Sequence, residues 1–278
     1  MRVDSHVHAF ADAIAERAMA ALLAKMPPGY AAFDGRLATL ADHLETHGFD
    51  AAVLCSIATK PSQFDVIRAW SQAIREGAFG TSAARRIVPF LSVHPGDPDR
   101  FAHIEQTARE GYKGLKFHSY YQDLVLDSPA AIDLMRCARD NNLAVLCHNG
   151  YDIAFPRDRV CEPARVRRLL DAVPGLRLIV SHFGGWMDWD EAERLLIGQP
   201  IAIEISMSLS YLPPERLRAM LLRHPIDAIL YGSDWPWSNH ASELALLESL
   251  GLPVDRMAAL MGDNAARLLG LAPAPAAG

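Results

Sequence analysis

The chain alternates between short apolar runs and longer amphipathic segments, and this alternation occurs eight times. Several runs are apolar at nearly every position, as in "AAVLCSI", which is typical of parallel strands that are covered on both faces. The segments between the runs often begin with helix-entrance residues, such as the Ser and Pro of "DSPAAID". The eight predicted strands span residues 2–8, 51–57, 87–93, 113–119, 143–148, 176–182, 201–206 and 228–234.

Eight strand–helix units in a chain of 278 residues match an α/β fold of one type, a single (β/α)8 TIM barrel, and a doubly wound open sheet is the competing arrangement. No linker rich in Pro, Gly or Ser divides the chain. We therefore expect one barrel domain over residues 1–270 and a disordered tail, "LAPAPAAG", over residues 271–278. A barrel places its active site at the C-terminal ends of the strands.

The amino-acid composition restricts the classes of molecule that the protein is expected to bind. The net charge is −6 and no basic stripe is present, which argues against nucleic acid. No apolar run approaches the roughly 20 residues of a membrane span, and the N-terminus lacks the pattern of a signal peptide. The four cysteines show no C-x-x-C pairing, so we expect reduced thiols in the cytoplasm. The expected partner is a small-molecule substrate, and a homodimer is the base-rate expectation for assembly.

The first predicted strand ends in "VDSHVH". Successive side chains alternate across a strand, so His6 and His8 face the same side, as two ligands of one cation must. Two ligands do not make a site, because zinc-like centres need three or four. The other strands have to supply the remaining ligands.

Other predicted strands also end in ionisable residues, and in a barrel these ends meet at one rim. They are Lys116 and His118 on the fourth strand, His148 on the fifth, His182 on the sixth and Asp234 on the eighth. An apolar strand that ends in histidine is costly unless that side chain is hydrogen-bonded or ligated.

Four of the strand-end side chains, His6, His8, His148 and Asp234, make a plausible ligand set for one divalent ion. Zinc is the expected ion, and manganese or iron also suits such ligands. The ion would lower the pKa of a bound water and polarise a carbonyl group. Asp234 could then take the proton, and His182 could act as an acid or base or hold the substrate oxygen.

Six motifs occur in order along nearly the whole chain: "VDSHVH", "GYKGLKFHS", "LCHNG", "IVSHFGG", "LYGSDWPW" and "MGDNAARLLG". In these motifs the chain resembles the amidohydrolase superfamily, specifically its metal-dependent TIM-barrel branch, amidohydrolase family 2. The resemblance implies that His6, His8, His148 and Asp234 are metal ligands and that His182 is the catalytic histidine. The family includes hydrolases of amides, esters and lactones, and also nonoxidative decarboxylases and hydratases.

Lys116 has two interpretations. In some members of the superfamily a lysine of the fourth strand is carboxylated and bridges two metal ions. Alternatively, Lys116 binds a carboxylate of the substrate or pairs with acidic groups at the rim, and we expect this role together with a single ion. His118 shares a face with Lys116 and is expected to bind substrate or a second ion.

The loops after the strands supply further candidates for substrate binding. Aromatic residues in these loops either suit a flat or cyclic substrate or close the top of the barrel: Trp235, Trp237, Tyr120 and Tyr121. Tyr151 follows the fifth strand and is a further candidate. Arg157 could clamp a substrate carboxylate, or it could pair with a neighbouring Asp. Glu204 lies inside an apolar run and needs a partner, for which Lys116 or an arginine is expected.

The predicted function is a metal-dependent hydrolase that uses a metal-activated water on an ester, lactone or amide. The alternative is a nonoxidative decarboxylase of an aromatic or unsaturated carboxylic acid on the same metal site. A barrel that binds a ligand without catalysis is a third possibility, and the full set of strand-end ligands argues against it.

Overall fold

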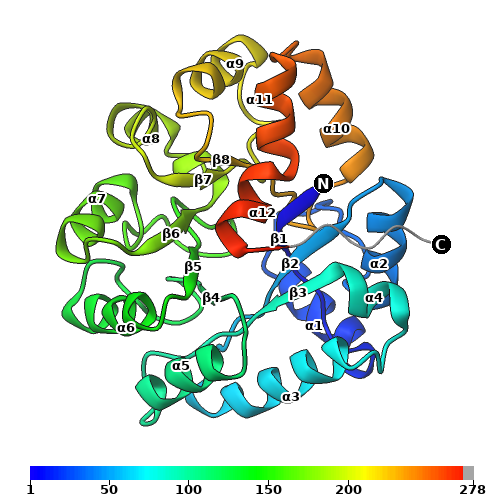
Figure 1. Ribbon diagram of the computed structural model, residues 1–278, viewed down its shortest axis with the longest axis vertical. Helices are drawn as coiled ribbons and strands as arrows, with labels where there is room; N and C mark the ends of the chain where they lie inside the picture. The colour runs from blue at the N-terminus through cyan, green and yellow to red at the C-terminus, as the bar shows by residue number, and fades with distance from the viewer. Residues whose placement is uncertain (272–278) are drawn as a thin grey trace.

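The computed structural model describes residues 1–271, and its eight parallel strands lie inside the eight predicted ranges (Figure 1). The strands are β1 Val3–Val7, β2 Ala51–Cys55, β3 Ile87–Phe90, β4 Gly114–Phe117, β5 Ala144–Cys147, β6 Arg177–Val180, β7 Ala202–Glu204 and β8 Ile229–Leu230. Most end earlier than predicted because the chain leaves the extended conformation at the rim. After β6 and β8, His182 and Asp234 have φ angles of 57° and 61°. The predicted tail lies, apart from Leu271, outside the described residues.

The strands close into a ring. Parallel pairing joins β1, β2 and β3 in one ladder and β4 to β8 in another. Between β3 and β4 the amide of Lys116 donates to the carbonyl of Leu91 at 2.8 Å, and between β8 and β1 the amide of His8 donates to the carbonyl of Trp235 at 2.6 Å. Both seams are therefore hydrogen-bonded, which distinguishes this (β/α)8 barrel from an open sheet with two free edges.

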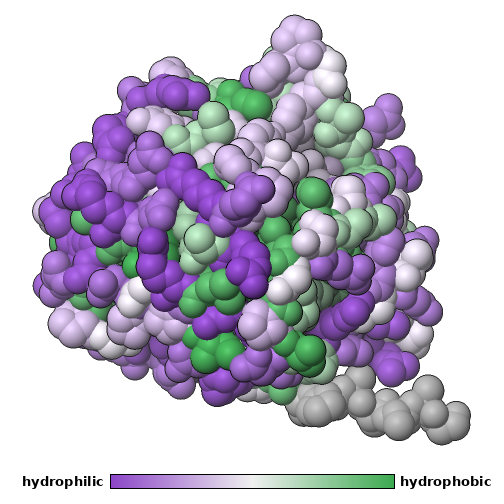
Figure 2. Space-filling view, turned by 90° about the horizontal axis from the view of Figure 1, so that it is seen from above, coloured by the Kyte–Doolittle hydropathy of each residue, from purple (hydrophilic) through white to green (hydrophobic). Residues whose placement is uncertain are grey.

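Helices form an outer layer around the strands (Figure 1). The helices of this layer are α2 Leu37–Thr46, α3 Phe64–Arg75, α4 Thr81–Arg86, α5 Arg100–Arg109, α6 Pro129–Asp140, α7 Pro163–Ala172, α8 Trp189–Leu195, α9 Pro214–Arg223, α10 His240–Ser249 and α11 Val254–Ala258. Helix α6 begins where "DSPAAID" predicts, and the Ser128 side chain accepts a hydrogen bond from the Ala131 amide. The face in Figure 2 is mainly hydrophilic, with smaller hydrophobic groups between.

Side chains that alternate along each strand build two layers of core. On β5, Ala144 and Leu146 belong to the cluster inside the barrel. Val145 and Cys147 belong to the larger cluster between the strands and the helices. Strands that are buried on both faces are expected to be apolar throughout, and this explains the continuous apolar runs.

The C-terminal segment covers the N-terminal end of the barrel. A π-helical turn, Ala259–Asp263, leads into α12 (Asn264–Leu269). The Asn264 side chain donates to the carbonyl of Ile229 at the start of β8. A Cβ at Gly262 would lie 2.2 Å from the carbonyl oxygen of Met1, so only glycine fits this approach.

A segment between β1 and α2 stands outside the repeating strand–helix pattern. Its helix α1 spans Asp12–Leu23. Leu22, Met26 and Tyr30 of this segment line the same cavity as the strand-end histidines. The segment therefore covers the C-terminal end of the barrel, and we call it the cover segment (residues 11–36).

None of the helices in residues 1–271 is long and apolar enough to cross a membrane. The four cysteines, all within the described part of the chain, are free.

Candidate active site and metal centre

The predicted polar strand ends converge on a cavity of about 110 Å³. Its lining includes eight of the predicted site residues: His6, His8, Lys116, His118, His148, Tyr151, His182 and Asp234. They come from the C-terminal ends of β1, β4, β5, β6 and β8 or from the loops that follow. The expectation that these ends meet at one rim is confirmed.

Three of the four proposed ligands point at one another. His6 Nε2 lies 3.1 Å from His8 Nε2, and Asp234 Oδ1 lies 3.4 Å from His6 Nε2 and 3.2 Å from His8 Nε2. Ligand atoms about 2.1 Å from a tetrahedral zinc ion would lie roughly 3.4 Å apart. The triangle formed by His6, His8 and Asp234, the metal triad, therefore has the dimensions of one face of a coordination shell.

Hydrogen bonds on the far side of each ring orient the two histidines. His6 Nδ1 donates to Glu204 Oε1 at 2.9 Å, and His8 Nδ1 donates to the carbonyl of Cys55 at 2.6 Å. When neutral, both rings therefore direct a lone pair on Nε2 towards the centre of the triad. Asp234 Oδ1 is buried there and has no hydrogen-bond partner among the described residues. This donor set fits a divalent ion.

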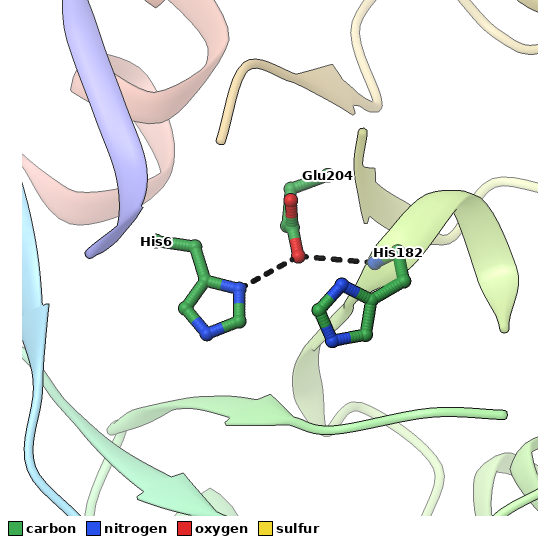
Figure 3. Close-up of side chains that lie close together, drawn as sticks. All are labelled: His6, His182 and Glu204. Carbon is green, nitrogen blue, oxygen red and sulfur yellow. Dashed lines mark hydrogen bonds and ion pairs between the residues drawn. The ribbon is translucent and has the colours of Figure 1, made fainter. Parts of the chain in front are cut away.

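Glu204 of β7 holds two parts of the site together (Figure 3). Its Oε1 accepts from His6 Nδ1, from the backbone amide of His182 at 3.1 Å and from the Ser206 hydroxyl at 2.9 Å. The expectation of a lysine or arginine partner was wrong, because neutral donors satisfy this carboxylate. Burial raises the pKa of Glu204.

Gly232 leaves the space that Glu204 occupies. A Cβ at this position would lie 2.4 Å from Glu204 Oε2 and 3.1 Å from His6 Cβ. Substituting Gly232→Ala should displace Glu204 and loosen the His6 ring, and we expect metal affinity to fall about 10- to 100-fold. Competition with a fluorescent chelator measures this affinity, and Gly96→Ala, outside the cavity, is the control. Unchanged affinity in Gly232→Ala would show that Glu204 does not orient His6.

His148 does not join the metal triad in this geometry. Its Nε2 donates to the carbonyl of Tyr151 at 3.0 Å, so the neutral ring carries its lone pair on Nδ1. That atom lies 3.0 Å from His182 Nε2, and His182 Nδ1 lies 2.9 Å from the Ser206 hydroxyl. The structure therefore couples His148 to His182, whereas the family resemblance implies a role for His148 as the fourth metal ligand.

His148 instead belongs to a second group, with His118 and Asp152. His118 Nε2 lies 3.2 Å from Asp152 Oδ2, and the His118 and His148 rings are stacked with centroids 4.1 Å apart. Two stacked imidazoles cannot both direct in-plane lone pairs at one ion, so this group fits a binding surface better than a second metal site. Asp152 was not predicted, although "HNGYD" places it four residues after a strand-end histidine.

Lys116 lies beside the metal triad. Its side chain is fully buried, and its Nζ is 2.8 Å from His6 Nε2. A buried ammonium group needs an anionic or ligating partner, and the adjoining cavity is where a substrate carboxylate could supply one.

Two predicted substrate-binding residues lie elsewhere. Trp235 is fully buried, and its ring stacks on Phe33 in the core, while Trp237 lines the cavity in its place. Arg157 is exposed, and its guanidinium lies 5.1 Å from the ring centre of Tyr151. Alternation along "DWPW" would put Trp235 and Trp237 on the same side, so it does not distinguish them, and the path of a loop is not encoded in its periodicity.

Burial lowers the pKa of four imidazoles in the cavity, those of His6, His118, His148 and His182. Burial alone would raise the pKa of Asp234, but the neighbouring His6 and His8 outweigh it and lower that pKa below its usual range. At neutral pH these four imidazoles are therefore neutral and Asp234 is ionised, which are the forms that bind a metal ion.

The lowered imidazole pKa values predict loss of stability in acid. Below about pH 6.5 the unfolded chain binds protons that the folded protein excludes, so the free energy of unfolding falls by up to about 1.4 kcal/mol per pH unit for each such imidazole. The raised pKa values of Glu204, Glu243 and Asp188 act in the opposite direction and offset at most three of these imidazoles. Four imidazoles outside the cavity, those of His43, His47, His94 and His224, also have lowered pKa values and add to the loss. We expect metal-free protein to have a lower Tm at pH 5 than at pH 7.

The variant His118→Asn should show a smaller decrease in Tm between pH 7 and pH 5, because one excluded proton is removed. His103→Asn, outside the cavity, is the control. The same Tm at both pH values in the unmodified protein would contradict the prediction.

Comparison with known proteins agrees with this architecture. A family model described as Amidohydrolase matches residues 3–271, and no curated protein matches the chain. Among solved structures, 5-carboxyvanillate decarboxylase LigW from Sphingomonas paucimobilis has a TM-score of 0.73 at 17% identity, covering 98% of this chain and 99% of that one. A probable 2-pyrone-4,6-dicarboxylic acid hydrolase from Acinetobacter baumannii has a TM-score of 0.63 at 17% identity, with coverage of 97% and 99%.

A third structure, 5-carboxyvanillate decarboxylase LigW2 from Novosphingobium aromaticivorans with bound manganese, has a TM-score of 0.69 at 14% identity, with coverage of 98% and 97%. These identities establish a shared fold and leave the reaction open. The family model covers nearly the whole chain, and its span includes every strand that carries a cavity residue. The chain therefore belongs to the amidohydrolase family of enzymes.

Proposed function

We propose that the protein is a metal-dependent hydrolase of a small ester, lactone or amide. The observation that supports this most directly is the position of Asp234. Its Oδ1 lies 3.4 Å from His6 Nε2 and 3.2 Å from His8 Nε2 and has no hydrogen-bond partner among the described residues. An ionised carboxylate at this point can accept a proton from water, as hydrolysis requires, but it is a poor donor to carbon.

The proposed cofactor is one divalent ion held by His6, His8 and Asp234. Such an ion supplies a lowered pKa for water and polarises a carbonyl oxygen. Zinc suits two imidazoles and a carboxylate, and manganese accepts the same ligands. The manganese in the LigW2 structure supports manganese as the alternative.

The side chains around the metal triad have separate roles in the proposed hydrolysis. Asp234 accepts the proton of the attacking water and returns it to the leaving group. His182 lines the cavity, and a proton held between its Nε2 and His148 Nδ1, which lie 3.0 Å apart, can be donated to a developing oxyanion. Lys116 and Tyr151 line the same cavity and orient the substrate.

A second candidate is nonoxidative decarboxylation of an aromatic or unsaturated acid. Lys116 favours it, because a fully buried ammonium group 2.8 Å from a triad atom suits a substrate carboxylate. The likeness to two decarboxylase structures agrees with this alternative.

An isotope experiment separates the two reactions. Protein loaded with zinc or manganese is incubated in H₂¹⁸O with libraries of esters, lactones, amides and aromatic acids. Hydrolysis places ¹⁸O in a product carboxylate, whereas decarboxylation releases carbon dioxide and leaves no ¹⁸O in the product. We expect ¹⁸O incorporation, and carbon dioxide release alone would replace the first proposal with the second.

A further inference from the structure

A second cavity of about 420 Å³ adjoins the catalytic cavity. It lies between the cover segment and α3. Ala18 and Leu22 of α1 line one side, and Ile67 and Trp70 of α3 line the other. We call it the tail cavity.

The two cavities are continuous. Five residues line both: His8, Phe10, Leu22, Ile57 and Tyr121. His8 is a member of the metal triad, so a molecule whose reacting group lies at the triad can extend along His8 into the tail cavity.

The lining of the tail cavity disfavours a charged ligand group. No Asp, Glu, Lys or Arg is among its lining residues in the described part of the chain. Ser56 and Trp70 line it, and their Oγ and Nε1 atoms are buried without a hydrogen-bond partner in residues 1–271. A charged group would lose its hydration here without an ionic partner, whereas an apolar group with at most one or two polar atoms would not.

We propose that the tail cavity binds a neutral apolar group of the substrate, attached to the carbonyl that reacts at the metal triad. This inference rests on the proposed function and specifies its substrate class. A cavity of about 150 Å³ accommodates benzene, so the tail cavity, at about 420 Å³, accommodates a group of roughly two to three rings. The catalytic cavity, at about 110 Å³, holds little more than the reacting group, and the substrate's bulk belongs in the tail cavity.

A binding experiment that needs no turnover tests the proposal. N-phenyl-1-naphthylamine, a neutral dye that fluoresces in apolar surroundings, is titrated into the unmodified protein, Ala18→Phe and Ala20→Phe. Ala18 lines the tail cavity, whereas Ala20 is exposed on the same helix and lines neither cavity. We expect equal Kd values for the unmodified protein and Ala20→Phe and at least about tenfold weaker binding to Ala18→Phe. Ile67→Trp, on the opposite side, should behave like Ala18→Phe.

Displacement of the dye by straight-chain methyl ketones then measures length preference. Affinity should rise about three- to fourfold for each methylene until the chain fills the tail cavity. Equal dye binding in all variants, or displacement that does not depend on chain length, would overturn the proposal. So would dye binding that decreases as the protein concentration rises, because a second copy of the chain would then cover the cavity. Ile14 and Val66 line it and are 41% and 70% exposed.

The same variants distinguish failure of this inference from failure of the proposed hydrolysis. Suppose the protein hydrolyses p-nitrophenyl esters, but short and long acyl chains react equally in the unmodified protein and in Ala18→Phe. The proposed hydrolase function is then supported, and the proposed binding of an apolar group in the tail cavity is wrong. If no ester reacts but the dye and the ketones bind as expected, apolar binding in the tail cavity is supported and the proposed hydrolysis is wrong.

Discussion

The substitution Asp234→Asn should lower kcat/KM by about a thousandfold and leave the fold intact. Asn has the same shape as Asp, but its amide cannot accept the proton of the attacking water. Asp234 Oδ1 has no hydrogen-bond partner among the described residues, so the substitution removes no internal hydrogen bond of that atom. Steady-state kinetics and the thermal unfolding midpoint, measured on the same preparations, test the two halves of this prediction.

The control is Asp171→Asn, an exposed carboxylate on α7 that is 71% accessible. Its kcat/KM should equal that of the unmodified protein. Metal content has to be measured in both variants, because an amide in place of the Asp234 carboxylate could also weaken ion binding. Turnover near the unmodified level in Asp234→Asn with a full complement of metal would remove Asp234 from the mechanism.

The double substitution His6→Ala/His8→Ala should abolish metal binding and activity together. These residues contribute two of the three atoms of the triad, and the remaining carboxylate cannot hold a transition-metal ion alone. We expect about one equivalent of zinc or manganese per chain in the purified unmodified protein and none in the variant. Elemental analysis by mass spectrometry provides the measurement.

A double variant with two histidines removed outside the cavity, His47→Ala/His94→Ala, is the matched control and should retain its metal. Two equivalents in the unmodified protein would indicate a second ion and a carboxylated Lys116 as the bridge between them. No metal in the unmodified protein, even after incubation with zinc or manganese, would contradict the metal centre. The two histidines would then serve the substrate or the barrel structure.

The sequence determined the barrel and the composition of its rim. Eight apolar runs with polar ends require covered parallel strands, and a closed ring brings their C-terminal ends to one place. Alternation along "SHVH" was sufficient to put His6 and His8 on one side, because the two-residue period of a strand is local geometry.

Only the tertiary structure decided the assignment of the remaining side chains. Whether His148 faces the triad or His182 depends on the Tyr151 carbonyl in the loop that follows, and the partner of Glu204 depends on contacts among β1, β6 and β7. The cover segment and the tail cavity likewise arise where helices far apart in sequence pack against each other. Such contacts depend on loop paths and side-chain packing, which hydrophobic periodicity does not encode.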